Sequence, residues 1–371
     1  MEAGALRLEW EKEYLYWLCQ VPVLGAVKIK RLWQRYGSFE RIYNIEGIQL
    51  TEEQLLTTKE AACFDAWKSY FHRTVTEYRG LSQMGIRFVT ILDQDYPQRL
   101  KHLYDNPMGL YVKGRMPDEQ IPSVAIVGAR NCSNYGIQIS HMLGECLGRA
   151  GVQVVSGMAL GIDGAGHQGT LDAGGSTFAV LGSGVDVCYP RRHLPIYDKI
   201  PEKGGVISEF KLHEQPLAQH FPMRNRIISG LADAVIVVEA RERSGSLITV
   251  EQGLEQGREI FVVPGRMTDP LSLGCNQLIR QGANIVTCPQ DILEYFQIKS
   301  KENVSLCEKN QFGLAKNEKM VYSCLDFQPK FFDQVVEESG LPLEEVMQVL
   351  LELEWKGLIL QPASHYYVKK L

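Results

Sequence analysis

Two arginines, Arg224 and Arg226, stand near the start of the segment FPMRNRIISG, which runs from residue 221 to residue 230. Pro222 and the apolar residues after Arg226 predict that this segment opens a helix. The first turn of a helix carries free N–H groups and a partial positive charge, so two cations there are unfavourable. A bound anion between the arginines and the helix end would remove this conflict. The alternative is ion pairing within the domain, for which the candidate acids are Glu209, Asp233 and Glu239.

Four glycine-rich turns follow short apolar runs, and each offers groups that suit an anion. They are Gly128-Ala129-Arg130, Ser156-Gly157, Gly182-Ser183-Gly184 and Arg243-Ser244-Gly245. Glycine lets a backbone approach a ligand closely, and the helix after each turn directs its first N–H groups at the same space. Three more polar residues join this set, namely Asn225, Arg191 and Arg192. The set predicts a site for a nucleotide or a nucleic-acid backbone, because arginine forks and backbone N–H groups both bind phosphate.

A dinucleotide cofactor fits these turns poorly. The first turn, in VGARNCSNYG, lacks the G-x-G-x-x-G spacing. The second apolar run ends in Ser156-Gly157 instead of an acid that could bind a ribose. We therefore expect no cofactor.

Asp163 and His167 stand four residues apart in GIDGAGH, which is the helical spacing of a catalytic pair. We expect a structural role instead, and no catalytic residue in the chain. Asp163 is expected to cap the helix after the glycine turn, and His167 to pack or hydrogen-bond nearby.

The turns lie in a region of repeated strand and helix signals from about residue 123 to residue 296. Its six apolar runs are SVAIVGAR, VQVVSGMALG, STFAVLGSG, GGVISEF, ADAVIVVEA and EIFVVPG. Short continuous runs are typical of parallel strands that helices bury on both faces. We therefore predict a doubly wound α/β sheet whose carboxyl edge gathers the turns. Within residues 81–122, RFVTILDQDYP and MGLYVKG predict an extra strand pair that extends one edge of the sheet.

Changes in composition and periodicity divide the chain into four predicted parts. Residues 1–80 have helical periodicity, and PVLGAVKIKRLWQRYGS within them fits either a DNA-contacting helix-hairpin-helix or a plain pair of core helices. Residues 81–297 form the α/β domain, residues 298–317 a polar linker, and residues 318–371 a winged-helix domain. In this last domain KMVYSCLDF, FFDQVVEESG and LEEVMQVLLELEWKG predict three helices, and LILQ and YYVKK predict two strands.

The third of these helices is predicted to have an acidic outer surface. Its apolar face is expected to comprise Leu343, Val346, Val349, Leu350 and Leu353. The outer residues of this helix and the helix before it are Glu344, Glu345, Gln348, Glu352, Glu354, Asp333, Glu337 and Glu338. A helix that reads DNA is basic on its exposed face. We therefore expect this domain to contact a protein or to regulate the arginine site, and not to bind duplex DNA. A solvated acidic face without a partner is the alternative.

The overall composition narrows the possible functions. The 371 residues carry a net charge of -5, so a nucleic-acid site must rest on the local arginine cluster. The nine cysteines never form a C-x-x-C pair, and we expect neither a metal site nor a disulfide framework. The first residues lack the pattern of a signal peptide, and no stretch reaches the ~18 apolar residues of a membrane span. We expect a cytoplasmic protein without membrane contact.

Together these motifs resemble the DNA-processing protein A family, also called DprA or Smf. The matching segments, within about residues 85–296, are VAIVGAR, SGMALGIDGAGHQGTLDAGG, AVLGSGVDVCYP, FPMRNRIISGLADAVIVVEARERSGSLIT, VPGR and GCNQLIRQGA. The resemblance implies an extended Rossmann-type domain that binds single-stranded DNA, forms a homodimer and hands incoming strands to the recombinase RecA. It implies a role in DNA recombination during natural transformation, the uptake of DNA by competent cells.

The resemblance also implies roles for particular residues. It assigns DNA binding to Arg130, Arg224 and Arg226, with the Ser156-Gly157 and Gly182-Ser183-Gly184 turns lining the pocket. Ser176 is a departure, because many members carry a basic residue there, and Arg191 and Arg192 are candidates to replace that cation. A dimer through GCNQLIRQGANIVT would use Leu278, Ile279 and Ile285, which could instead close the core.

Two other functions are alternatives. A phosphoribohydrolase on the same fold would release a base from a nucleoside monophosphate, but it needs a P-G-G-x-G-T-x-x-E turn. The corresponding segment, RSGSLITVEQG, has no Gly-Gly pair, and its Glu251 is displaced. A scaffold that binds the recombinase without DNA is the other alternative, and the arginine cluster argues against it.

Overall fold

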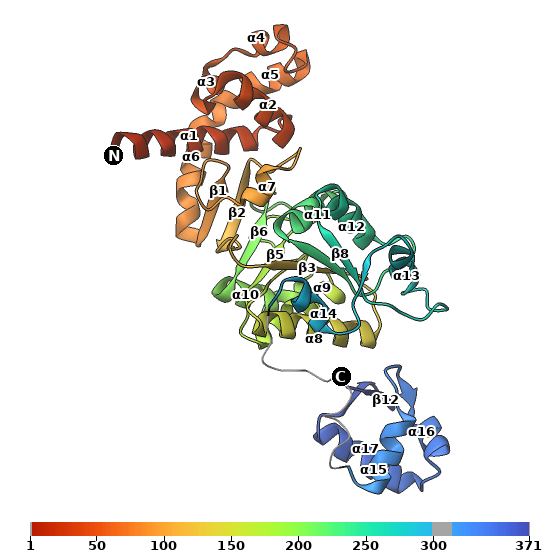
Figure 1. Cartoon of the computed structure of the whole chain (residues 1–371). Coiled ribbons are helices and arrows are strands. Elements are labelled where there is room, and N and C mark those ends of the chain that lie inside the picture. Colours follow the sequence, from red (N-terminus) through yellow and green to blue (C-terminus); the bar gives the residue numbers. More distant parts are fainter. Residues whose placement is uncertain (1, 299–313, 371) are drawn as a thin grey trace.

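The computed structural model describes residues 2–298 and 314–370, which form a helical part, an α/β part and a winged-helix part along the chain (Figure 1). Most of the predicted linker, residues 299–313, lies outside the described residues. The fold class predicted from the sequence is confirmed.

Helices fill residues 2–80. Their bounds are α1 (Glu2–Gln20), α2 (Ala26–Tyr36), α3 (Phe39–Asn44), α4 (Gly47–Glu52), α5 (Thr58–Trp67) and α6 (Phe71–Gly80), with the short 3-10 helices η1 (Lys68–Tyr70) and η2 (Leu81–Met84) before and after α6. Trp17, Leu18, Leu32, Phe39 and Phe64 are buried together at the centre of this part. This part therefore has a hydrophobic core, which Met108 of the α/β part joins.

The predicted hairpin is the turn between α1 and α2, and its lysines are engaged within the protein. Lys28 pairs with Glu60, and Lys30 Nζ donates to the carbonyl oxygen of Leu103 at 3.1 Å. These contacts favour the core helix pair over a DNA-contacting hairpin.

The carboxyl end of α1 is fastened to the α/β domain. Gln20 Nε2 donates to Tyr111 Oη at 2.8 Å, and Lys211 Nζ donates to the carbonyl oxygen of Gln20 at 2.7 Å. The Tyr16 ring meets the Phe88 and Tyr111 rings edge-on, at centroid distances of 4.9 and 5.9 Å. Through these contacts the helical part covers one end of the central sheet.

That sheet has nine strands in the order β1-β2-β6-β5-β4-β3-β7-β8-β9. Their bounds are β1 (Ile86–Thr90), β2 (Gly109–Gly114), β3 (Ser123–Val127), β4 (Gln153–Ser156), β5 (Thr177–Val180), β6 (Gly205–Ser208), β7 (Ala234–Val237), β8 (Glu259–Val262) and β9 (Asn284–Ile285). Seven neighbouring strands of the sheet run parallel, in the order β6-β5-β4-β3-β7-β8-β9. The strands β1 and β2 join as an antiparallel pair beside β6. The predicted edge extension within residues 81–122 is therefore confirmed.

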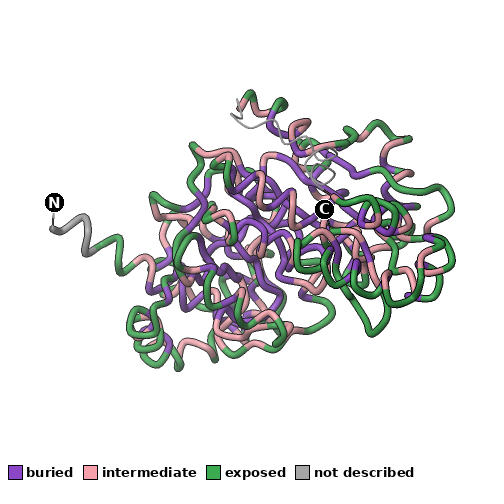
Figure 2. Tube along the Cα trace, turned by 90° about the horizontal axis from the view of Figure 1, so that it is seen from below, coloured by how far each residue is buried: buried purple, intermediate pink, exposed green. Residues whose placement is uncertain are grey.

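Helices cover both faces of the sheet (Figure 1), and the buried part of the trace lies inside an exposed outer layer (Figure 2). One face is covered by α8 (Asn134–Arg149), α9 (Ile162–Asp172), α10 (Leu194–Lys203) and α14 (Pro289–Tyr295). The other is covered by α7 (Gln98–Lys101), α11 (His220–Leu231), α12 (Gly245–Glu255) and α13 (Leu273–Arg280). The continuous apolar runs of the parallel strands are buried on both sides for this reason.

The C-terminal part is a winged helix. It comprises α15 (Lys316–Cys324), β10 (Lys330–Phe331), α16 (Phe332–Ser339), α17 (Leu343–Trp355), β11 (Ile359–Ala363) and β12 (Tyr366–Lys369). The three helices and two strands predicted from the sequence are present, and the short β10 completes the sheet. One prediction is wrong: Leu343 is exposed, because it is the first residue of α17 and precedes the part of the helix whose Val346, Val349, Leu350 and Leu353 pack in the core.

Glycines allow α8 and α9 to pack closely. A Cβ atom at Gly169 of α9 would lie 2.0 Å from the carbonyl oxygen of His141 in α8. A Cβ atom at Gly144 of α8 would lie 2.3 Å from the carbonyl oxygen of Gly166. Because both obstacles are backbone atoms, the helices would have to separate to admit a methyl group.

We predict that Gly169→Ala destabilises the protein by about 1–3 kcal/mol through overpacking. The matched control is Gly80→Ala in α6, where φ is -76° and no heavy atom lies within 4 Å of the added methyl group. This control is expected to be neutral or stabilising by up to about 1 kcal/mol. Urea unfolding of both variants measures the difference, and equal midpoints would contradict the role given to Gly169.

Candidate nucleic-acid interface

The chain order reverses at β3 and β7, which are neighbours in the sheet. Ligands of open α/β sheets bind beyond the carboxyl ends of the strands at such a switch point. A cavity of about 220 Å³ lies there. Its lining includes eight residues of the predicted or neighbouring motifs, namely Gly128, Arg130, Asp163, Phe221, Arg224, Asn225, Ser244 and Gly245. We refer to this cavity as the switch-point crevice.

Arg224 forms the inner wall of the crevice, with only 4 % of its surface exposed. Its Nη1 donates to the carbonyl oxygen of Gly157, after β4, at 2.7 Å, and to that of Val180, at the end of β5. Within the described residues its Nε has no hydrogen-bond partner. Burial lowers the pKa of Arg224 to about 10, against the attraction of Asp163. Because α11 begins at His220, Arg224 lies in its second turn, and the prediction of a first-turn position is wrong.

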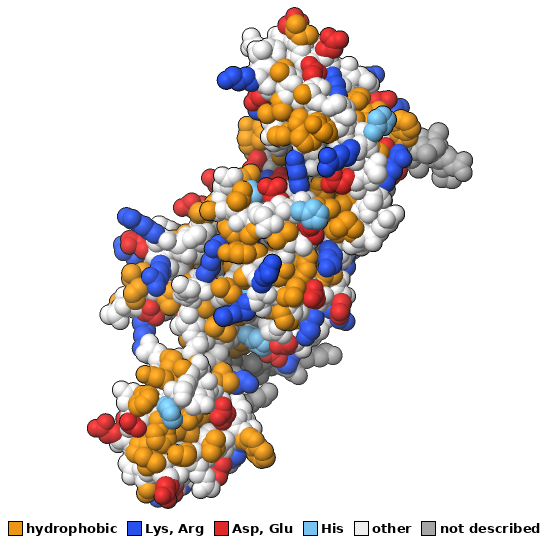
Figure 3. Space-filling view, turned by 180° about the vertical axis from the view of Figure 1, so that it is seen from behind, with side chains coloured by type: hydrophobic (Ala, Val, Ile, Leu, Met, Phe, Trp, Pro, Cys, Tyr) orange, Lys and Arg blue, Asp and Glu red, His pale blue; other side chains and the backbone are white. Residues whose placement is uncertain are grey.

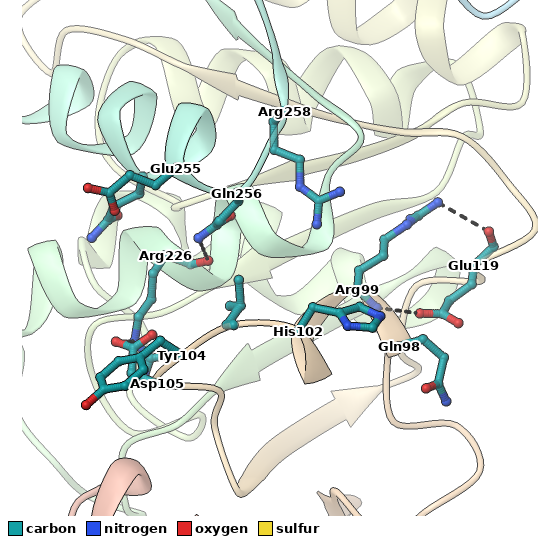
Figure 4. A pocket seen from close by; sticks show the side chains of 12 residues that line it. Gln98, Arg99, His102, Tyr104, Asp105, Glu119, Arg226, Glu255, Gln256 and Arg258 are labelled. Carbon is teal, nitrogen blue, oxygen red and sulfur yellow. Dashed lines mark hydrogen bonds and ion pairs between the residues drawn. The ribbon is translucent and has the colours of Figure 1, made fainter.

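Arg226 lies elsewhere. Its Nη2 pairs with Glu209, its Nε lies 3.0 Å from Asp105 Oδ2, and it is buried. It lines a second cavity, of about 770 Å³, where it lies beside Asp105 and Tyr104 (Figure 4). The two arginines therefore do not converge on one anion, and the alternative of an ion pair with Glu209 holds for Arg226. The reason is helical geometry, since residues two apart on a helix do not face each other.

Arg130 is the exposed cation of the crevice. Its guanidinium carbon lies 4.6 Å from the centroid of the Phe221 ring, and the Tyr189 ring is 6.0 Å from the same ring. A guanidinium over an aromatic face is a cation–π contact that holds the side chain without neutralising its charge. Phe221 was missed in the sequence. The sequence signal that could have identified it is its position directly before Pro222, at the start of α11.

The start of α12 forms the opposite side of the crevice. Ser244 caps this helix by accepting from the Ser246 N–H at 3.4 Å, and Gly245 is its first residue. Asn225 Nδ2 donates to the carbonyl oxygen of Gly245 at 3.4 Å and so links α11 to this helix end. Arg243 is exposed just before the cap. The partial positive charge of a helix N-terminus therefore faces the same space as Arg130.

Two of the predicted turns form hydrogen bonds within the protein and do not line the crevice. Ser156 Oγ donates to the carbonyl oxygen of Ile126 at 2.6 Å, and Ser183 Oγ to that of Val187 at 3.0 Å. The N–H of Gly157 donates to Asp163 Oδ2 at 3.1 Å, and the N–H of Gly184 to the carbonyl oxygen of Glu214 at 2.9 Å. Gly182 is buried, and neither turn is part of the crevice lining. These glycines and serines are engaged by the protein itself.

Arg191 and Arg192 are exposed on η3 (Arg191–His193), and neither lines the crevice. Ser176, the departure from the family pattern, lies just before β5 and accepts from Arg115 Nη2 at 2.7 Å. This is the amino end of the strand, whereas Arg224 contacts the carboxyl end at Val180. A cation at position 176 would therefore lie at the opposite edge of the sheet from the crevice.

Asp163 and His167 have structural surroundings. Asp163 Oδ2 accepts from the N–H groups of Gly157 and Ala159 and so holds the loop before α9, while burial raises its pKa. His167 Nδ1 lies 2.6 Å from Thr177 Oγ1 in the core. Burial lowers the pKa of His167 to about 3, and the nearby His193 and Arg224 lower it too. The imidazole is therefore neutral, which avoids a second buried cation near Arg224.

The residues predicted for a dimer differ in exposure. Leu278 is buried in the core, Ile279 packs against that core, and Ile285 is exposed on the edge strand β9. The alternative that these side chains close the core therefore holds for Leu278.

The described residues contain neither a membrane-spanning helix nor a metal-binding cluster. In residues 2–298 and 314–370, no helix is long and apolar enough to cross a membrane. The same residues contain no group of three or more His, Cys, Asp or Glu side chains placed to hold a metal ion.

The fold and the crevice define a doubly wound α/β protein with a cationic site at its switch point and an appended winged helix. The chain belongs to the DNA recombination-mediator protein A family, whose family model matches residues 87–297, and a DprA winged helix domain matches residues 308–363. It is 47% identical over 208 residues to the DNA processing protein DprA of Streptococcus pneumoniae. This match covers 56% of the chain and 73% of the relative. It is 41% identical to Protein Smf of Escherichia coli over 75% of this chain and 76% of that protein.

Two solved structures are similar. The X-ray structure of DprA from Streptococcus pneumoniae aligns with a TM-score of 0.67 and 36% identity, covering 76% of this chain and 97% of that chain. A DprA from Helicobacter pylori, whose structure addresses its mode of binding single-stranded DNA, aligns with a TM-score of 0.50 and 26% identity over 57% of this chain and 95% of that one.

The buried His167 predicts a loss of stability in mild acid. An unfolded histidine has a pKa near 6.5, and burial depresses the folded value to about 3. The stability that a neutral His167 contributes is therefore complete above about pH 6.5 and falls as the pH drops towards 3. Between pH 7 and pH 5 the loss amounts to about 2 kcal/mol. In His167→Asn, which can keep a contact with Thr177, the free energy of unfolding should fall by about 2 kcal/mol less over this range.

Urea unfolding at the two pH values measures this change. The control is His72→Asn on the exposed side of α6, which should keep the wild-type pH dependence. An unchanged pH dependence in His167→Asn would exclude the buried histidine as its source.

Proposed function

We propose that the chain binds single-stranded DNA at the switch-point crevice. The observation that carries the proposal is the exposed Arg130 guanidinium, held over Phe221 and facing the N-terminus of α12. A phosphate fits between these two positive groups. The single-stranded DNA that the Helicobacter pylori relative binds supports the choice of ligand.

The aromatic rings at the crevice suit an unpaired base. Tyr189 is exposed and lies next to Phe221, so a base without a complementary strand can approach the Tyr189 ring. In a duplex the ring faces of the bases are covered by stacking. Arg224 acts from behind, because its Nη1 is engaged by carbonyl oxygens while its charge raises the potential of the crevice.

The wider role is part of the same proposal. The chain protects incoming single strands in the cytoplasm and passes them to RecA during natural transformation, as the family resemblance implies and as the family's description as a recombination mediator supports. It acts by binding and not by catalysis. Glu251, the acid that a phosphoribohydrolase would need, is exposed on α12, and Asp163 is engaged by two N–H groups. Release of free base from nucleoside monophosphates by the purified protein would favour the enzyme instead.

We predict that Arg130→Ala weakens binding of a fluorescein-labelled oligothymidine by about 5- to 150-fold, the range for a lost charge-assisted contact of about 1–3 kcal/mol. Its slope of log affinity against log salt should be shallower by about 0.7, the value for one phosphate on a single strand. The control is Arg149→Ala at the end of α8, where the side chain pairs with Glu145. Fluorescence anisotropy over a range of salt measures both effects. Equal affinity of the wild type for duplex, or an unchanged slope in Arg130→Ala, would contradict the proposal.

The homodimer is proposed to form at the sheet edge next to β9. In the segment from the end of β8 through β9, the large apolar side chains that are exposed are Met267, Leu273 and Ile285. A short edge strand leaves unpaired N–H and C=O groups that a second copy can cover. We predict that Ile285→Glu with Leu273→Glu lowers the mass measured by sedimentation from dimer to monomer, whereas Met84→Glu, an equally exposed position, leaves it unchanged. A folded variant with unchanged mass would exclude this edge.

A further inference from the structure

The outer face of α17 carries a row of large apolar side chains at a regular spacing of four residues. They are Leu343, Met347, Leu351 and Trp355, exposed by 52 %, 48 %, 59 % and 97 %. Other residues of the helix already supply the core, namely Val346, Val349, Leu350 and Leu353. The row is therefore not needed to hold the winged helix together. We refer to it as the α17 ridge.

The ridge has the geometry with which one helix packs on another. Side chains four residues apart form the ridges that enter the grooves of a facing helix. From its first to its last residue the row is about 18 Å long, at 1.5 Å per residue. A partner helix of about the same length could cover it. On the face that Figure 3 shows, hydrophobic side chains of this domain lie together, with acidic ones around them.

Charges beside the ridge select the chemistry of the partner. Glu344 and Glu352 follow ridge residues by one position, and Glu354 precedes Trp355, and all three are exposed. Asp333, Glu337 and Glu338 are exposed on α16. Within residues 314–370 nine acidic residues stand against six lysines. Phosphate backbones and anionic lipid surfaces would be repelled, which leaves a protein surface with basic side chains.

The rest of the chain that the structure describes leaves the ridge open. Where the winged helix meets α8, the contacts come from other elements: Gln138 Nε2 donates to the carbonyl oxygen of Lys369 at 3.1 Å, and the Tyr135 and Phe327 rings are 6.1 Å apart. Neither contact involves α17. Docking on the ridge therefore requires no rearrangement at α8.

We propose that the α17 ridge is the docking site for a basic amphipathic helix of a partner protein. The apolar stripe of that helix packs on Met347, Leu351 and Trp355, and its lysines or arginines pair with Glu344, Glu352 and Glu354. This assigns a partner surface and a partner chemistry to the winged helix, and it is independent of DNA binding at the switch-point crevice.

The test uses the full chain and a designed peptide of about five helical turns, with leucines on one face and lysines on the other. Fluorescence anisotropy is expected to show binding by the wild type. Met347→Glu with Leu351→Glu should weaken it about tenfold or more, because both residues lie at the centre of the contact. Glu344→Gln with Glu352→Gln should weaken it several-fold and reduce its dependence on salt. The control, Ile48→Glu with Met84→Glu, introduces the same charges at exposed apolar positions elsewhere and should bind normally.

Several outcomes would overturn the proposal. They are absence of peptide binding by the wild type, equal binding of a scrambled peptide of the same composition, and unchanged binding by the Met347→Glu, Leu351→Glu variant. A fall in sedimenting mass in that variant alone would show that a second copy of the chain occupies the ridge, which also overturns it. Each variant should keep its melting temperature and its affinity for single-stranded DNA, so a failure at the crevice is distinguished from a failure at the ridge.

Discussion

A buried guanidinium, that of Arg224, joins α11 to the carboxyl ends of the central strands. Removing a cation from water costs several kcal/mol unless polar groups replace the water. Here the replacements are the carbonyl oxygens of Gly157 and Val180, with the carboxylate of Asp163 nearby. A Cβ atom at Gly157 would lie 2.2 Å from Nη1, so position 157 must be glycine for the contact to form. The contact thus ties one side chain of α11 to the carboxyl ends of β4 and β5, and it constrains the residue type at position 157.

The crevice and the α17 ridge are opposite in character. The crevice combines an exposed arginine with a helix N-terminus, whereas the ridge combines apolar side chains with carboxylates. A net charge of -5 describes neither surface. Because charges beyond about 8–10 Å are screened at physiological salt, each surface selects its ligand locally. The two proposed sites therefore suit ligands of opposite charge and do not compete for the same one.

Much of the fold could be predicted from the sequence, because its strands are short apolar runs between glycine turns, and burial on both faces leaves no other composition for them. The three helices of the winged helix were equally readable from periodicity. The contacts between residues that are distant in the sequence could not be predicted in this way. Arg226 pairs with Glu209 and Asp105, which come from other segments, so its neighbour Arg224 gave no guide to its role. Ser156 and Ser183 were assigned to the pocket by position, but local hydrogen bonds turn their hydroxyl groups inwards. Leu343 shows that a helical period gives the angle of a side chain and not what it faces.

The attachment of α1 to the sheet has a consequence for the order of folding during synthesis. The residues of the helical part can collapse on one another early, since every buried residue of their core except Met108 lies between Tyr14 and Phe64. Docking must wait, because Lys211, which holds the carbonyl oxygen of Gln20, is 191 residues further along. At about 5–20 residues per second, a ribosome needs about 10–40 s to supply it. During that interval Tyr16 and the end of α1 lack their final cover, and the nascent chain presents an aromatic surface that the growing sheet later encloses.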